Sequence, residues 1–279
     1  MYMKATGIDN IGNTCYINSA IQVLFFSPSL TNALIHGKDN FTHITNEVFV
    51  NYNKVIYELF KKRSPNNNIM NELLDSILKE HPHYENMKRH HDGHETLLAI
   101  IDSLDEAVKP LTHIQQVFDT TIKHEIICKA CNHSVKGEYK TRNHSVENSC
   151  KSIQEGIKQQ FEEEQLEGYK CDKCKEQKCK SKKNIVSLPH HLIININMYD
   201  IYGRKKRHNI DIDDKIEIDG KEYGLYATLC HHGSSNFGHY TANCISRGVR
   251  YFIDDETVTE TESEKKFKYN AYTLLYRKI

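Results

Sequence analysis

The first third of the chain carries apolar residues at helical spacing. Between residues 17 and 24 the apolar side chains recur at i, i+3, i+4 and i+7, which places them on one face of a helix. We expect Asn13 or Thr14 to cap the start of this helix and Ser27-Pro28 to end it. The same periodicity predicts further helices over residues 48–60, 69–78 and 93–104.

From about residue 115 the pattern changes to short segments in which apolar and polar residues alternate, as in half-buried strands. Helices followed by strands indicate an α+β fold rather than alternating βαβ units. The chain has no long Pro/Gly/Ser linker, so we expect a single domain over residues 1–279. Strands are predicted over residues 117–128, 184–196, 223–231, 240–245, 249–253 and 271–277.

Charge and hydropathy narrow the functional class. The 279 residues include 37 Lys and Arg against 37 Asp and Glu, so the formal net charge is zero. A nucleic-acid-binding domain normally carries a basic excess. This chain has none, so we do not expect a nucleic-acid partner. No apolar run reaches the roughly 18 residues of a membrane span, and the N-terminus lacks the apolar core of a signal peptide. We therefore expect an intracellular protein, cytoplasmic or nuclear, with reduced thiols and no membrane partner.

Four of the nine cysteines form two Cys-x-x-Cys pairs, Cys128/Cys131 and Cys171/Cys174. Each pair can present two thiolates, and two pairs complete a tetrahedral zinc site. Roughly forty residues separate the pairs, so the intervening chain should form strands of its own. Because four cysteines leave no ligand position open, we expect the Zn²⁺ to be structural.

Cys15 follows a turn of Gly and Asn residues and opens the first predicted helix, where free N–H groups and the helix dipole favour a thiolate. A thiolate nucleophile needs a histidine and a group that orients it. His239 follows a glycine-rich loop, residues 233–238, at the start of a strand. The next strand ends in Asp254-Asp255, and antiparallel pairing would bring Asp254 beside His239.

Two other patterns are given structural interpretations. His90 and His94 lie four residues apart, a spacing used by zinc ligands, but the H-E-x-x-H arrangement is missing, so we expect no second metal. Basic runs over residues 178–183 and 203–208 fall between predicted strands, and we expect solvated hairpin loops rather than polyanion sites.

Several segments resemble the ubiquitin-specific proteases. Residues 7–22 resemble the Cys box of that family, and residues 223–242 resemble its His box. Residues 252–258 and 271–276 fit the end of the family domain, so the similarity runs from residue 7 to residue 277. It implies a papain-like hand: a helical thumb over about residues 1–114, zinc-bearing β fingers over 115–185 and a β-sheet palm over 186–279.

Carried over by position, the resemblance implies Cys15 as nucleophile, His239 as base and Asp254 as the acid that orients it. Asn10 matches the asparagine of the oxyanion hole. Asp255 would be a secondary orienting group. No organic cofactor is implied.

The family cleaves after the C-terminal glycine of ubiquitin, so the resemblance implies a thiol-dependent deubiquitinase that hydrolyses isopeptide or peptide bonds through a thioester. The arginines of the ubiquitin tail need acidic partners, which Asp92 and Glu95 match, and Tyr240 is expected at the same substrate site. The family's paired glutamines are replaced by His90-His91. A protease for a ubiquitin-like modifier and a catalytically silent ubiquitin-binding scaffold remain alternatives. The oligomeric state stays open, with a monomer favoured.

Overall fold

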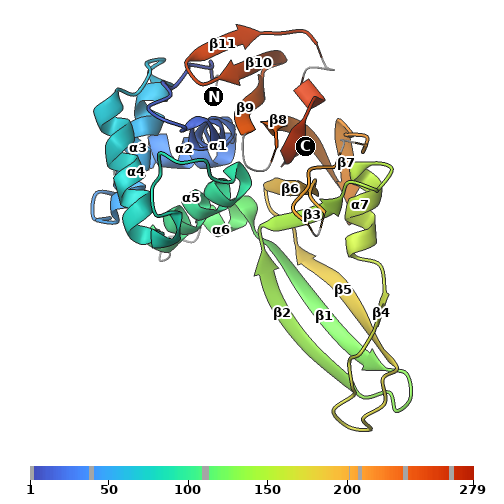
Figure 1. Cartoon of the computed structure of the whole chain (residues 1–279). Coiled ribbons are helices and arrows are strands. Elements are labelled where there is room, and N and C mark those ends of the chain that lie inside the picture. Colours follow the sequence, from blue (N-terminus) through green and yellow to red (C-terminus); the bar gives the residue numbers. More distant parts are fainter. Residues whose placement is uncertain are drawn as a thin grey trace.

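The structure is a computed structural model that describes residues 3–37, 41–108, 113–200, 202–206, 209–234, 238–263 and 267–279. Most helices gather on one side of the molecule and a large sheet stands beside them, whereas α7 (Ile153–Gln160) lies apart from the other helices, near β3 (Asn143–Glu147) and β7 (Lys215–Ile218); a smaller sheet extends away from the helices and the large sheet (Figure 1). The helices are α1 (Cys15–Phe25), α2 (Pro28–His36), α3 (Glu47–Phe60), α4 (Asn67–Glu80), the 3-10 helix η2 (Pro82–Tyr84), α5 (Gly93–Ala107), α6 (His113–Phe118) and α7 (Ile153–Gln160). In the part of the chain that is described, no helix is long and apolar enough to cross a lipid bilayer.

The strands form two sheets. The small sheet has the order β2-β1-β5-β4, and the large sheet has the order β11-β10-β9-β8-β12-β6-β3, with β7 paired to β8. Only β3 and β6 pair in parallel in these ladders. The strands are β1 (Thr120–Cys128), β2 (Ser134–Thr141), β3 (Asn143–Glu147), β4 (Glu164–Leu166), β5 (Cys179–Ser187), β6 (His191–Asn197), β7 (Lys215–Ile218), β8 (Lys221–Gly233), β9 (Gly238–Ser246), β10 (Val249–Asp254), β11 (Thr257–Glu260) and β12 (Ala271–Lys278).

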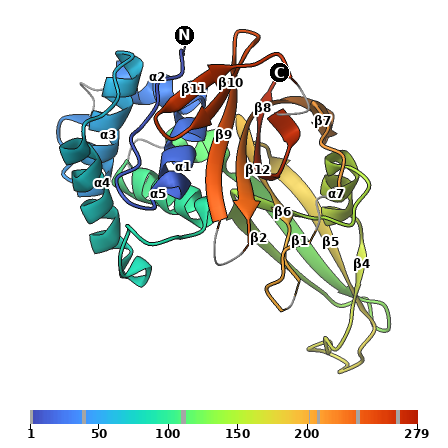
Figure 2. The same ribbon diagram turned by 45° about the horizontal axis from the view of Figure 1, so that its top comes forward.

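Helix α1 lies at the centre of the core. All eleven of its residues are buried, and it packs between α5 and β9 (Figure 2). Burial on every side explains why polar residues such as Asn18 and Gln22 must find partners inside the protein. Truncation of a core side chain such as Leu24 to Ala should cost about 2–5 kcal/mol. The helix therefore holds its first residue, Cys15, in a rigid position.

The α+β order is as predicted, but several boundaries differ. Residues 117–128 are the end of α6 followed by β1, not one strand. Residues 184–196 belong to two strands, because Pro189 lies between β5 and β6 and cannot donate to a sheet ladder. Pro28 follows the first helix as expected, but it also occupies the first turn of α2, where a missing N–H costs nothing.

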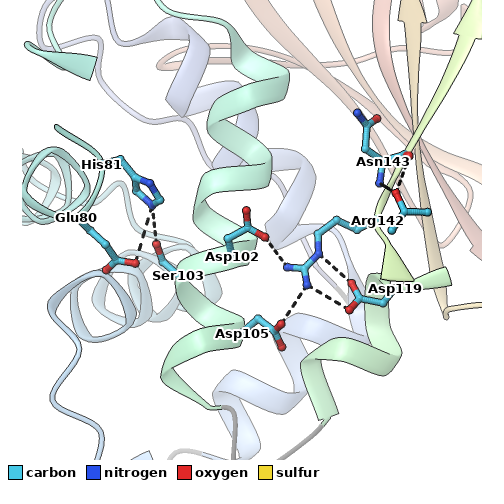
Figure 3. Close-up of polar contacts among 9 residues, drawn as sticks. Glu80, His81, Asp102, Ser103, Asp105, Asp119, Arg142 and Asn143 are labelled. Atoms are coloured by element: carbon cyan, nitrogen blue, oxygen red, sulfur yellow. Dashed lines mark hydrogen bonds and ion pairs between the residues drawn. The ribbon is translucent and has the colours of Figure 1, made fainter. Parts of the chain in front are cut away.

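The small sheet joins the helical region through Arg142, which lies between β2 and β3 (Figure 3). Its guanidinium contacts Asp102 and Asp105 of α5 at 2.8 and 3.0 Å. Asp119, between α6 and β1, accepts from the same group at 2.9 Å. The Arg142 side chain is 16% exposed, and its pairs with Asp105 and Asp119 are shielded from solvent, whereas Asp102 is 60% exposed. Burial raises the pKa of Asp119 although Arg142 lowers it, so this joint depends on the arginine.

Candidate active site and metal centre

Cys15 is the first residue of α1, and the loop before it is held by Asn10. The Asn10 side-chain oxygen accepts from the backbone N–H groups of Gly12 and Thr14, both at 3.1 Å. Thr14 is the N-cap residue of α1, one of the two expected, but its side chain makes no capping hydrogen bond. Thr14 Oγ1 instead accepts from the N–H of Ile11, and the Asn13 amide donates to the carbonyl of Lys88. The turn thus places the buried Cys15 without a side-chain cap on its helix.

His239 and Asp254 meet across the antiparallel pair β9/β10, with 2.6 Å between His239 Nε2 and an Asp254 carboxylate oxygen. The nearby Cys15 thiol raises the pKa of His239 most, burial opposes it, and Asp254 raises it further, to about 9. At neutral pH the imidazole is therefore protonated and can pair with a thiolate.

Asp255 does not bind the imidazole as the sequence suggested. Its two carboxylate oxygens accept from Asn10 Nδ2 at 2.7 Å and from Asn18 Nδ2 at 2.8 Å. Burial raises the pKa of Asp255, while these two amides lower it. Asp255 therefore fixes the Asn10 side chain beside the nucleophile, and its effect on His239 is electrostatic.

A cavity of about 270 Å³ adjoins this site, between the start of α5 and the palm sheet. Tyr240, on the strand that carries His239, lines it and stacks on His231 with 4.6 Å between ring centroids. Tyr240 also packs against Gly93, where a Cβ atom would come within 3.0 Å of the ring. The remaining lining residues are His90, His91, Asp92, Tyr199, Gly203 and Gly238.

The two acidic candidates lie at the start of α5 but differ in their surroundings. Asp92 caps the helix: one oxygen accepts from the N–H groups of His94 and Glu95, and the other accepts from the Tyr272 hydroxyl at 2.7 Å. Glu95 is exposed. Its carboxyl group is nevertheless partly desolvated, and this desolvation and the nearby Asp92 raise the pKa of Glu95. Asp92 is thus fixed in the cavity wall, whereas Glu95 presents a freer carboxylate.

His231, which lines the cavity, interacts with Lys205, and the sequence did not predict this interaction. Lys205 Nζ donates to the His231 carbonyl at 2.6 Å and to His231 Nδ1 at 3.1 Å. Burial and Lys205 lower the pKa of His231 to about 4, so this histidine is neutral. The interpretation of residues 203–208 as a solvated loop is therefore wrong for Lys205, while Arg207 and His208 lie outside the described residues. The other basic run is not a loop either, because it enters β5 at Cys179.

The two Cys-x-x-Cys pairs meet at the tip of the small sheet, and their four sulfurs lie within 4.8 Å of one another. The residues that follow the second cysteines, Asn132 and Lys175, have positive φ values of 56° and 63°. Each donates its N–H to the carbonyl of the first cysteine of its pair at 2.9 Å. Two turns of the same geometry thus direct four thiols to one point, and the cluster fits one tetrahedral metal ion. The intervening chain forms β2, β3, α7 and β4, so strands are present there as predicted.

His90 and His94 do not form a second metal site within the described part of the chain. His94 is 4% exposed and bonds Asn143 and Thr273 through its two nitrogens. It is a core histidine with both nitrogens satisfied, which is why its spacing from His90 carries no chemistry.

Asn18 and Lys205 were not identified from the sequence. A signal existed for Asn18, because it lies next to the apolar face of a predicted core helix, where a polar group needs a partner. No pattern singled out Lys205 within its basic run, since its partial burial depends on its bridge to Tyr199 and its contact with His231 of β8.

The geometry can be compared with known proteins. A model of the family described as ubiquitin carboxyl-terminal hydrolase matches residues 6–276. The protein "Ubiquitin carboxyl-terminal hydrolase 36" of Drosophila grimshawi is 26% identical over 312 residues, which cover 99% of this chain and 25% of that protein. Its Drosophila melanogaster counterpart is 26% identical over 311 residues and is covered to 30%. The chain thus spans about a quarter to a third of the length of these relatives.

Among solved structures, the SAGA Ubp8/Sgf11/Sus1/Sgf73 DUB module bound to ubiquitin aldehyde contains a chain that superposes with a TM-score of 0.83. The alignment covers 99% of this chain and 70% of that chain at 22% identity. This likeness confirms the predicted hand: helical thumb, β fingers with the cysteine cluster, and palm sheet. Because the family model covers nearly all of its length, the chain belongs to the ubiquitin carboxyl-terminal hydrolase family.

Proposed function

We propose that this chain is a cysteine deubiquitinase, which hydrolyses isopeptide or peptide bonds after the C-terminal glycine of ubiquitin. The observation that carries the proposal is His239, which is bonded to Asp254 beside Cys15 and next to a cavity and has a pKa raised to about 9. An imidazolium beside a thiol at a helix start is the arrangement that makes cysteine a nucleophile near neutral pH. The names of the relatives and the ubiquitin-bound Ubp8 structure support ubiquitin as the substrate.

In the proposed reaction the Cys15 thiolate attacks the glycine carbonyl carbon, and the carbonyl electron pair moves to oxygen. The Asn10 amide keeps a second hydrogen beside the one that it donates to Asp255, and that hydrogen stabilises the oxyanion. When the intermediate collapses, the C–N bond breaks and His239 protonates the leaving amine. The neutral imidazole then takes a proton from water, which hydrolyses the thioester and restores the thiolate.

We further propose that Cys128, Cys131, Cys171 and Cys174 hold structural Zn²⁺, whose thiolate ligands match that ion. When bound, the ion cross-links the ends of the small sheet. The end of β1, where Cys128 stands, points away from α1, so the cluster would shape a surface for the ubiquitin body (Figure 1). Glu95, and Asp92 in the cavity wall, would face the arginines of the tail.

The test is hydrolysis of C-terminal aminocoumarin conjugates of ubiquitin and of ubiquitin-like modifiers by the purified chain. We expect turnover of the ubiquitin conjugate and its loss on Cys15→Ala. Turnover of another modifier alone would establish the ubiquitin-like alternative. Binding of ubiquitin without turnover of any conjugate would establish the silent scaffold.

A further inference from the structure

The tip of the fingers contains a fifth thiol, Cys179. Its side chain is 1% exposed and packs in the same buried cluster as Cys128 and Cys171. It stands outside the four sulfurs that lie within 4.8 Å of one another. It nevertheless lies opposite Cys128, the member of that group on the neighbouring strand. The tip thus offers five thiols for the four positions of a tetrahedral ion.

The strand register explains why Cys179 points at the metal position. Cys179 begins β5 directly opposite Cys128, which ends β1. The N–H of Lys129 donates to the carbonyl of Lys178 at 2.8 Å, so the two cysteines form a non-hydrogen-bonded pair. Such pairs are the closer kind in an antiparallel ladder, with Cα atoms about 4.5 Å apart. Side chains that face each other across a ladder lie on the same face of the sheet.

The backbone of Cys179 is also held from its other side. Leu166 of β4 pairs with it, and the Gln165 amide donates to its carbonyl at 2.6 Å. A change in the position of its sulfur therefore needs only a rotation about the Cα–Cβ bond, between staggered rotamers. The cost of that rotation is small beside the free energy of a metal–thiolate bond.

We propose that Cys179 is a spare ligand of the metal centre, which replaces Cys128 whenever that thiol is lost to substitution or oxidation. Cys174 has no such substitute, because it belongs to the opposite turn and the strand partner of Cys179 is Cys128. Loss of Cys128 and loss of Cys174 should therefore differ in their effect on metal retention, although each removes one of four chemically identical ligands. This inference rests on the metal proposed above and not on deubiquitinase activity.

The experiment compares the metal content of purified Cys128→Ser and Cys174→Ser after challenge with a chelator, with the Co²⁺ thiolate spectrum as a second readout. Cys128→Ser should keep one metal ion per chain and a four-thiolate spectrum, whereas Cys174→Ser should lose the metal. Cys179→Ser alone should retain it. The double variants Cys128→Ser/Cys179→Ser and Cys128→Ser/Cys179→Val should both lose it, and the valine preserves apolar packing where the serine does not.

Equal metal loss in Cys128→Ser and Cys174→Ser would overturn the proposal. Retention of metal by Cys128→Ser/Cys179→Val would do so as well, because the thiol of Cys179 would then not be the replacement. A wild-type chain without metal would remove its premise, and that result is distinguishable from absent deubiquitinase activity because the metal is measured directly.

Discussion

The start of α1 and the tip of the fingers use cysteine in opposite ways. Cys15 is alone among thiols, and its partner is His239, whose side chain is 45% exposed. At the fingertip, cysteine faces cysteine, and the metal position is closed to any further ligand. The Cys15 sulfur stays available to a substrate carbonyl, whereas a metal would occupy the sulfurs of the finger cysteines. The partner of a thiol, rather than its burial, thus separates a nucleophile from a structural ligand.

Loss of the nucleophile should give the largest effect. Cys15→Ala removes the only atom that can form the thioester, so hydrolysis of a ubiquitin conjugate should fall by about 10⁴-fold or more. Ubiquitin binding, measured by calorimetry, and the melting temperature should stay near those of the wild type. The matched control is Cys150→Ala, because this buried thiol belongs to neither site and contacts Gln159. Comparable turnover by Cys15→Ala and Cys150→Ala would contradict the assignment.

Loss of a metal ligand at the tip of the small sheet should mainly lower the stability of the protein. Cys174→Ser should release the metal and lower the melting temperature by roughly 10–20 °C, because binding free energy of a structural metal is folding free energy. Calorimetric melting with and without chelator measures this. An unchanged melting temperature after demonstrated metal loss would show that the cluster is not structural.

Loss of the Arg142 ion pairs, which join the small sheet to α5, should have the next largest effect. Arg142→Ala removes the guanidinium that Asp102, Asp105 and Asp119 share, which should cost about 3–5 kcal/mol in urea unfolding at pH 7. Burial already raises the pKa of Asp102 and Asp119, so these groups protonate more readily as pH falls. The cost should therefore shrink toward pH 5.

Arg63→Ala provides the matched control, since Arg63 pairs with one carboxylate, Glu58, and is 56% exposed. Exposed ion pairs contribute about 0–1 kcal/mol. Equal costs for the two arginines would mean that Arg142 does not lock the fingers to α5.

Asp254→Asn should give the smallest effect. The amide oxygen still accepts from His239 Nε2, so kcat/KM should fall about 10- to 100-fold, less than the loss on His239→Ala. The pKa of His239 is about 9, and its protonated form is the active one, so wild-type activity should decline above that pH. Because Asp254 helps to raise this pKa, the asparagine should move the alkaline decline to lower pH. A profile that does not move would show that Asp254 does not tune the imidazole.

Much of the fold and of the active site could be predicted from the sequence, because these features are specified by residues that lie close together in the chain. The helix after Cys15 and the two Cys-x-x-Cys turns are specified within a few residues, and helix periodicity is strong where one face is buried. His239 and Asp254 were brought together by a single assumption, that neighbouring strands pair antiparallel.

What was missed depends on contacts between distant segments. The role of Asp255 is set by Asn10 and Asn18, roughly 240 residues earlier in the chain, and no local rule connects them. The spacing of the cysteines does not relate Cys179 to the metal ligands, because its position opposite Cys128 follows from the strand register. Register is determined by the packed sheet, not by a motif.

The most direct test of the central claim is labelling with a ubiquitin probe that carries a C-terminal electrophile, followed by peptide mapping. The account predicts a single covalent adduct on Cys15, none on the fingertip cysteines, and no adduct in Cys15→Ala. An adduct on a fingertip cysteine, or no adduct on folded and metal-loaded protein, would contradict it.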